Sequence, residues 1–261
     1  MLPGRSQAAY YARHAGWTYE ILDTGGFFLA SALSPYRNDS RTLTVYLEGD
    51  GRAFVGSRTP SADPTPGTPT ALRLALAHPG PAAWLGRPCQ YADRDTSRNC
   101  HPAYWSSHRY APEVIADTSR ALDELKRRSR AQSLILVGYS GGGAVAALTA
   151  ARRNDVVGLV TIAANLDLGY WVSHDGLAPL TGSLDPVDDA AKLRALPQVH
   201  FAGRRDDVVR PDVIRSYLAR LAPTPQARLV EMPDFDHVCC WISAWPDIIN
   251  RSEFATIPGW R

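Results

Sequence analysis

The chain has 261 residues, of which 45% are apolar and 21% are charged, and its formal net charge is +2. This size and balance are those of a globular protein with a sizeable core, and they argue against a disordered chain. No apolar stretch approaches the roughly 20 residues that cross a membrane. The tightest basic cluster, residues 126–130, closes an expected helix, where cations suit the helix dipole. We therefore expect no transmembrane segment and no nucleic-acid partner.

Expected strands and helices alternate along the chain. Two strands separated by Gly25 and Gly26 predict an opening hairpin. Continuous apolar runs further on, such as residues 134–137, are typical of parallel strands that are covered on both faces. The expected strands are residues 18–23, 27–33, 43–47, 82–85, 134–137, 156–164, 199–202 and 227–232. The expected helices are residues 70–78, 112–131, 142–153 and 188–196, and one more that begins at Pro211.

This alternation predicts an α/β fold, a three-layer sandwich whose central sheet is mostly parallel and carries an antiparallel N-terminal hairpin. No change of composition divides the chain, so we expect one domain over residues 1–261. Residues 167–197 leave room for a small cap or flap, but not for a full lid domain. In such folds the active site lies at the carboxyl ends of the parallel strands.

The motif that carries most chemistry is Gly138-Tyr139-Ser140-Gly141-Gly142, which fits the pattern G-x-S-x-G. It comes directly after the buried run 134–137 and directly before an expected helix. That strand–turn–helix setting is the one in which this motif exposes a nucleophilic serine above a sheet. The backbone N–H of Gly141, at the start of the helix, is placed to bind an oxyanion. The alternative is that Ser140 only caps the helix.

With this motif the sequence resembles the α/β-hydrolase superfamily over most of its length. More narrowly it is similar to bacterial, often exported, α/β-hydrolases of poorly defined substrate, in residues 46–51, 60–64, 87–91 and 235–237. The superfamily resemblance implies a serine hydrolase whose serine, acid and histidine follow one another in that order. No H-E-x-x-H, C-x-x-C or P-loop motif occurs, so we expect neither a metal nor a cofactor.

The acid and the base follow from that order. Asp206 stands where the resembled turn, G-x-x-D-x-V-V, carries the acid, and Asp207 and Asp167 are its rivals. His237 follows the last expected strand by a short loop. We expect His237 to take the proton of Ser140, and Asp206 to hold the imidazole tautomer and stabilise its cation.

The second oxyanion donor is expected after the strand 43–47. Lipases and esterases often read H-G-G-G there, whereas this chain reads Glu48-Gly49-Asp50-Gly51. The backbone N–H of Asp50 can still donate, because a backbone donor needs no particular side chain. Carboxylates facing an oxyanion would oppose it, so we expect Glu48 and Asp50 to be tied to loop donors such as Arg52, Arg58 or Arg87. Alternatively, the acidic pair only shapes a tight turn.

These assignments predict hydrolysis of a small-molecule acyl substrate, most simply a carboxylic ester. A peptidase or a thioesterase with the same three residues is the first alternative, and a catalytically silent binding module is the second. Aromatic side chains are candidates for the pocket wall. They are Tyr139, Tyr170, Trp171 and Trp241.

The four cysteines bear on the compartment. A bridge between Cys89 and Cys100 would close a loop of about ten residues and contribute roughly 2–3 kcal/mol. The other possibilities are a bond between the adjacent Cys239 and Cys240, and four free buried thiols. Residues 1–13 lack the apolar run of a signal peptide, whereas a Cys89–Cys100 bridge would imply an oxidising compartment. We therefore expect a periplasmic or secreted protein whose export signal is missing from this sequence, with the cytoplasm as the alternative.

Overall fold

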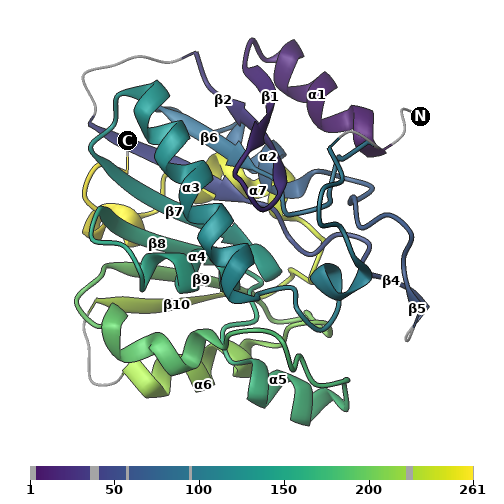
Figure 1. Ribbon diagram of the computed structural model, residues 1–261. Helices are drawn as coiled ribbons and strands as arrows, with labels where there is room; N and C mark the ends of the chain where they lie inside the picture. Colours follow the sequence, from purple (N-terminus) through teal and green to yellow (C-terminus); the bar gives the residue numbers. More distant parts are fainter. Residues whose placement is uncertain (1–3, 36–40, 57–58, 94–95, 222–225, 261) are drawn as a thin grey trace.

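The computed structural model describes residues 4–35, 41–56, 59–93, 96–221 and 226–260. An eight-stranded sheet in the order β1-β2-β6-β3-β7-β8-β9-β10 forms its centre (Figure 1). From β6 to β10 all neighbours are parallel, while β2 pairs antiparallel with both β1 and β6. The mostly parallel sheet with an antiparallel N-terminal hairpin is thus confirmed. The strands are β1 (Thr18–Asp23), β2 (Phe28–Leu33), β3 (Thr42–Leu47), β6 (Ala82–Leu85), β7 (Ser133–Tyr139), β8 (Val156–Ile162), β9 (Gln198–Gly203) and β10 (Ala227–Met232).

Helices cover both faces of the sheet and make three layers. One face packs against α3 (Pro112–Ser129), α4 (Gly141–Ala150) and α6 (Pro211–Leu221). The other packs against α1 (Gly4–His14), α2 (Thr70–Ala75) and α7 (Trp241–Ile248). In Figure 1, α3 and α4 lie in front of the sheet and α2 and α7 lie behind it.

The continuous apolar runs of the sequence have a direct structural reason. Along β7, Leu134 and Leu136 join the core on the α3–α4 side, whereas Ile135 and Val137 join the core on the α2–α7 side. Successive strand residues point to opposite faces, so a strand that is covered twice needs apolar residues at every position.

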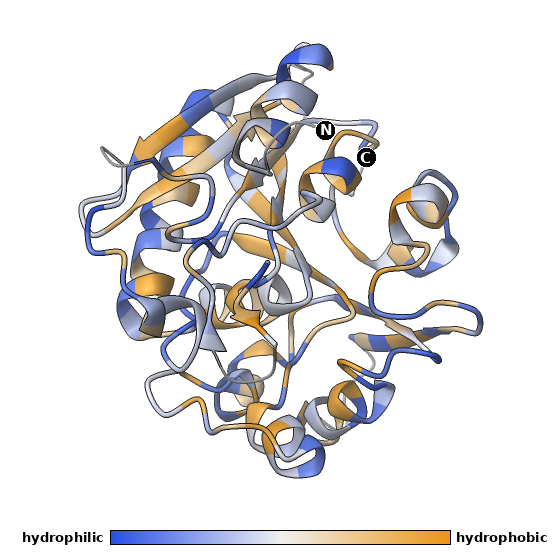
Figure 2. Cartoon of the chain, turned by 90° about the vertical axis from the view of Figure 1, so that its right-hand side faces the viewer, coloured by the Kyte–Doolittle hydropathy of each residue, from blue (hydrophilic) through white to orange (hydrophobic). Residues whose placement is uncertain are grey.

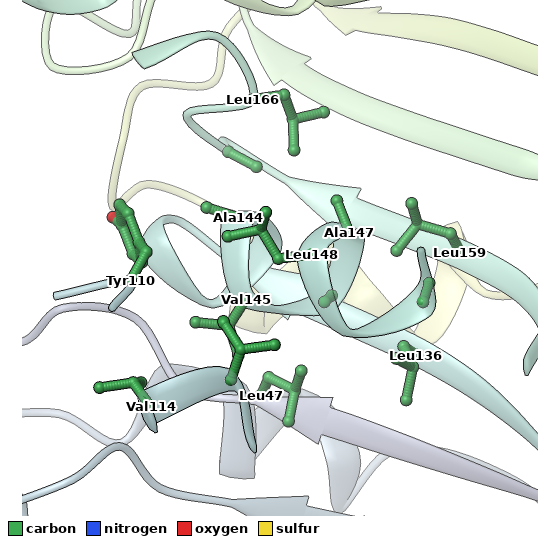
Figure 3. Packing of buried hydrophobic residues seen from close by; sticks show 14 of the residues in the cluster. Leu47, Tyr110, Val114, Leu136, Ala144, Val145, Ala147, Leu148, Leu159 and Leu166 are labelled. Carbon is green, nitrogen blue, oxygen red and sulfur yellow. The ribbon is translucent and has the colours of Figure 1, made fainter. Parts of the chain in front are cut away.

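Helix α4 is the most deeply buried helix in the described part of the chain. All ten of its residues are buried, and their sequence, GGGAVAALTA, consists of small and apolar side chains. Figure 3 shows Ala144, Val145, Ala147 and Leu148 packed among Leu136 and Leu159 of the sheet and Val114 of α3. Small residues let α4 lie close to the sheet, and only Ser140 separates its first residue from the end of β7.

Several elements were not expected from the sequence. Among the side chains of helix α1 whose burial is described, Ala8 and Ala12 are the buried ones, too few apolar positions to mark a helical stripe. Residues 167–197 hold α5 (Leu168–Asp175) and a 3₁₀ helix, η2 (Pro186–Leu193), so the helix expected over residues 188–196 is displaced and of another type. The remaining short elements are β4 (Phe54–Val55), β5 (Thr59–Pro60), η1 (Pro102–Trp105) and η3 (Ser252–Thr256).

Figure 2 views the side of the molecule on which β4 and β5 lie in Figure 1. Its outer helices carry both blue and orange stretches, as amphipathic helices do when one face packs on a sheet. None of the described helices is long and apolar enough to cross a membrane.

Candidate active site

Ser140 stands on a sharp turn between β7 and α4. Its φ is positive, at 51°, with a ψ of −127°, a backbone conformation that residues other than glycine rarely adopt. The turn is possible because its neighbours are glycines: a Cβ on Gly138 would lie 2.3 Å from the carbonyl oxygen of Gly142, and one on Gly142 would lie 2.3 Å from that of Leu47. Such a backbone conformation persists only where the surroundings fix it, and it is common at functional sites.

Ser140, His237 and Asp206 form one chain of hydrogen bonds. The serine Oγ lies 3.0 Å from Nε2 of His237, and Nδ1 of the same ring lies 2.9 Å from Oδ2 of Asp206. Because Oδ2 can only accept from a ring N–H, the proton of the neutral imidazole belongs on Nδ1, which leaves Nε2 to accept from the serine hydroxyl. The three residues come from the ends of β7, β10 and β9, far apart in the sequence.

The carboxylate of Asp206 is held in place from its other side. Its Oδ1 accepts the backbone N–H groups of Val208 and Val209 at 2.9 and 2.8 Å, and the residue is 2% exposed. Asp207, its rival, is exposed. Asp167, the other rival, caps α5: Oδ1 accepts from the backbone N–H of Tyr170, and Oδ2 accepts from the hydroxyl of Ser216. Of the three aspartates, only Asp206 bonds to His237.

Asp50 lies against the start of α4. A Cβ on Gly141 would lie 2.0 Å from Oδ1 of Asp50, so the carboxylate of Asp50 packs directly against Gly141, the residue after Ser140. In the described chain no acceptor takes the backbone N–H of either residue. Both N–H groups therefore remain available as donors, which the predicted oxyanion hole requires.

The side chain of Asp50 is neutralised by arginine, as expected, although by more partners than the sequence suggested. Arg87 donates to Oδ1 at 3.0 Å, and Arg109 and Tyr110 donate to Oδ2 at 2.7 and 2.8 Å. Burial opposes ionisation, but the positive charges of Arg109 and Arg87 outweigh it and lower the pKa of Asp50. Arg52 does not take part in this described cluster, and Arg58 lies outside the described residues.

Within the described part of the chain Glu48 has no arginine partner, whereas Arg58, one of the three arginines expected to bind it, lies outside that part. The carboxyl of Glu48 accepts the N–H groups of Gly49, Ala71 and the Trp84 indole, at 3.2, 3.1 and 3.0 Å. Burial raises the pKa of Glu48 to about 7, against the lowering effect of these donors. With its acceptors occupied, Glu48 serves to join β3, α2 and β6.

A cavity of about 430 Å³ opens at Ser140 and His237. Tyr139 and Trp171, two of the candidates for the pocket wall, are among the residues that line it. The Tyr139 hydroxyl donates to the carbonyl of His237 at 2.9 Å, and the Trp171 indole donates to the carbonyl of Val208 at 2.7 Å. Both aromatic residues thus also brace the loops that carry the base and the acid.

Trp241 and Tyr170, the other two candidates for the pocket wall, are not among the residues that line this cavity in the described chain. Trp241 is fully buried at the start of α7, and its ring packs edge-to-face against Phe235. Its indole donates to the carbonyl of Asp236 at 3.0 Å. It supports the His237 loop from behind. Tyr170 stacks on His174 along α5.

The structure pairs Cys89 with Cys100, whose Cα atoms lie 5.5 Å apart, a separation typical of disulfides. It also pairs the adjacent Cys239 and Cys240.

The sequence did not predict Arg109 and Tyr110 as partners of Asp50, because no periodicity marks the irregular stretch between η1 and α3.

Comparison with known proteins identifies similar folds but no sequence family. Scans of the sequence find no matching family model and no similar curated protein. Among solved structures, an esterase of Pyrococcus furiosus superposes with a TM-score of 0.65 at 12% identity, over 93% of this chain and 92% of that one. An α/β serine hydrolase without lid from Xanthomonas campestris gives 0.57 at 15% identity, over 93% and 95%.

An acylaminoacyl peptidase of Pyrococcus horikoshii gives a TM-score of 0.64 at 11% identity, over 88% of this chain and 38% of that one. Likeness at such low identity concerns the arrangement of the backbone and not the substrate. The chain has the fold of the α/β-hydrolase superfamily.

Proposed function

We propose that the protein is a serine hydrolase that cleaves carboxylic esters through an acyl-enzyme intermediate. The observation that carries this proposal is the hydrogen-bonded chain from Ser140 Oγ through His237 to Asp206. A buried carboxylate, an imidazole and a hydroxyl in this order form a nucleophile with its general base, which is the arrangement that acyl transfer requires.

In the first half-reaction Ser140 Oγ attacks the ester carbonyl while Nε2 of His237 takes its proton. The carbonyl oxygen becomes an oxyanion, which the backbone N–H groups of Asp50 and Gly141 stabilise. The imidazolium that forms is stabilised by Asp206. It then gives its proton to the departing alcohol, and the acyl group stays on Ser140. In the second half-reaction a water molecule attacks the acyl carbon while His237 takes its proton. His237 then returns this proton to Ser140 Oγ as the bond between the serine and the acyl group breaks, and the carboxylic acid is released.

The cavity agrees with a small or medium acyl substrate. Its volume of about 430 Å³ lies in the lower part of the range for ligand pockets, roughly 300–1,000 Å³. Trp171, Val208 and Val209 contribute apolar surface to it, and Tyr139 stands beside His237. A panel of p-nitrophenyl esters of rising chain length should therefore give a maximum of kcat/KM at short or medium acyl chains.

Esters should be hydrolysed faster than amides. For a p-nitrophenyl ester and the p-nitroanilide of the same acid, we expect kcat/KM to differ by at least roughly 10²-fold, because an alkoxide or phenolate leaves with less need of protonation than an amine. The Ser140→Ala variant measures the background for both substrates. Equal kcat/KM values would replace the esterase assignment by that of a peptidase.

We also propose that the protein works in an oxidising compartment, periplasmic or extracellular. The proposal rests on the pairing of Cys89 with Cys100. Alkylation of the unfolded protein without reductant should then modify at most two cysteines, and after reduction all four, as measured by intact mass. Four modified cysteines without reductant would place the protein in the cytoplasm instead.

A further inference from the structure

The peptide unit between Gly49 and Asp50 has a side-chain partner that the proposed mechanism does not use. The amide Nε2 of Gln90 donates to the carbonyl oxygen of Gly49 at 2.8 Å. The Oε1 of the same amide accepts the backbone N–H of Arg87 at 3.2 Å. A flipped amide would face a carbonyl with oxygen and an N–H with nitrogen, so both hydrogen bonds fix the orientation of Gln90. The residue is 2% exposed.

This contact determines where the N–H of Asp50 points. The peptide unit is planar and trans, so the carbonyl of Gly49 and the N–H of Asp50 point in opposite directions. Gln90 binds the carbonyl on one side of the loop. The N–H is therefore directed away from Gln90, and it has no acceptor in the described chain. Gly49, Asp50 and Ser140 line the same cavity.

The segment that carries Gln90 is itself rigidly held. Its two neighbours, Cys89 and Tyr91, have φ values of 68° and 59°, in the left-handed region. Cys89 is paired with Cys100, and the backbone N–H of Tyr91 donates to the hydroxyl of Thr65 at 2.8 Å. Non-glycine residues keep such conformations only where several contacts fix them. The segment that carries the amide of Gln90 is therefore held in one conformation.

We propose that Gln90 is a positioning residue that aims the backbone N–H of Asp50 at the oxyanion through the Gly49–Asp50 peptide plane. The proposal rests on the proposed function. Gln90 does not touch the substrate, so its effect falls on the transition state, where the oxyanion exists, and not on substrate binding.

The test is Gln90→Glu in the full chain at alkaline pH. Glutamate has nearly the same shape and still accepts from Arg87, but its carboxylate faces the carbonyl of Gly49 and repels it. We expect kcat to fall roughly 10²-fold, the effect of losing one oxyanion donor, while KM changes little. The inhibition constant of a trifluoromethyl ketone, which forms a tetrahedral adduct with Ser140, should rise by a similar factor.

Gln90→Met is the second variant, because it removes the donor without adding a charge, and it should show the same pattern. Gln198→Glu is the matched control. Gln198, at the start of β9, is also fully buried, and its amide donates to the carbonyl of Leu193 at 2.8 Å and accepts from the hydroxyl of Tyr217. It should lower the melting temperature but leave kcat and inhibitor affinity unchanged.

The outcomes separate the two proposals. An active wild type whose folded Gln90→Glu and Gln90→Met variants keep kcat and inhibitor affinity overturns the role of Gln90 alone. A loss that appears equally in Gln198→Glu shows a general effect on stability and also overturns it. A wild type that neither hydrolyses esters nor reacts with the ketone overturns the proposed function and this role with it.

Discussion

Replacing Ser140 or His237 by alanine should lower kcat on the best p-nitrophenyl ester by about four to six orders of magnitude, with the fold intact. Ser140→Ala removes the nucleophile, and His237→Ala removes the base that accepts its proton at 3.0 Å. Since both groups act in the same step, the loss in the double variant should be close to that in either single variant. Steady-state kinetics and circular dichroism check the two parts of the prediction.

A fluorophosphonate probe gives an independent measurement, because it reacts with an activated serine whatever the natural substrate is. It should label the wild type, fail on Ser140→Ala and react far more slowly with His237→Ala. Ser34→Ala is the control, since Ser34 is a buried serine whose hydroxyl accepts from the backbone N–H of Ala82 at the far end of β6. A Ser140→Ala or His237→Ala variant that keeps more than a tenth of wild-type turnover contradicts the assignment.

The parts of the fold that the sequence predicted are those that local chemistry specifies. A strand covered on both faces must be apolar at successive positions, so β7 is visible in residues 134–137 without any knowledge of its partners. The turn at Ser140 is visible for a similar reason, because only glycine fits at residues 138 and 142. The assignment of Asp206 and His237 beside Ser140 also needed the resemblance to the α/β-hydrolase superfamily, which supplies the order serine, acid, histidine.

The parts that the sequence did not predict depend on contacts between distant segments. Asp50 could be expected to need a cation, but Arg109 and Tyr110 reach it across some sixty residues. Trp241 follows the base in the chain, yet α7 turns its ring toward Phe235 and away from the cavity. A pattern of a few residues does not determine on which side of a loop a tryptophan packs. For the same reason Gln90, in an irregular segment, gave no signal of its contact with Gly49.

Replacing Asp206 by asparagine should lower kcat by about 10⁴-fold. The amide has one oxygen and one nitrogen, and Val208 and Val209 donate their N–H groups to the position of Oδ1. The amide oxygen is therefore held there, and the NH₂ group faces Nδ1 of His237. Nδ1 must then accept a hydrogen bond from this NH₂ group, so the ring proton moves to Nε2. A protonated Nε2 can no longer take the proton of Ser140. Hence the variant should fold, bind substrate with a similar KM, and turn it over slowly.

Two further aspartates make the prediction specific. Asp207→Asn changes an exposed neighbour of the acid and should leave kcat within a factor of a few. Asp167→Asn should act on stability and not on kcat, because Asp167 caps α5 through the N–H of Tyr170. The melting temperature and kcat, measured together on the three variants, separate the two kinds of effect. A loss of kcat in Asp167→Asn larger than that in Asp206→Asn would move the acid to the end of β8, since it would show that the bond between His237 and Asp206 is not the one that orients the base.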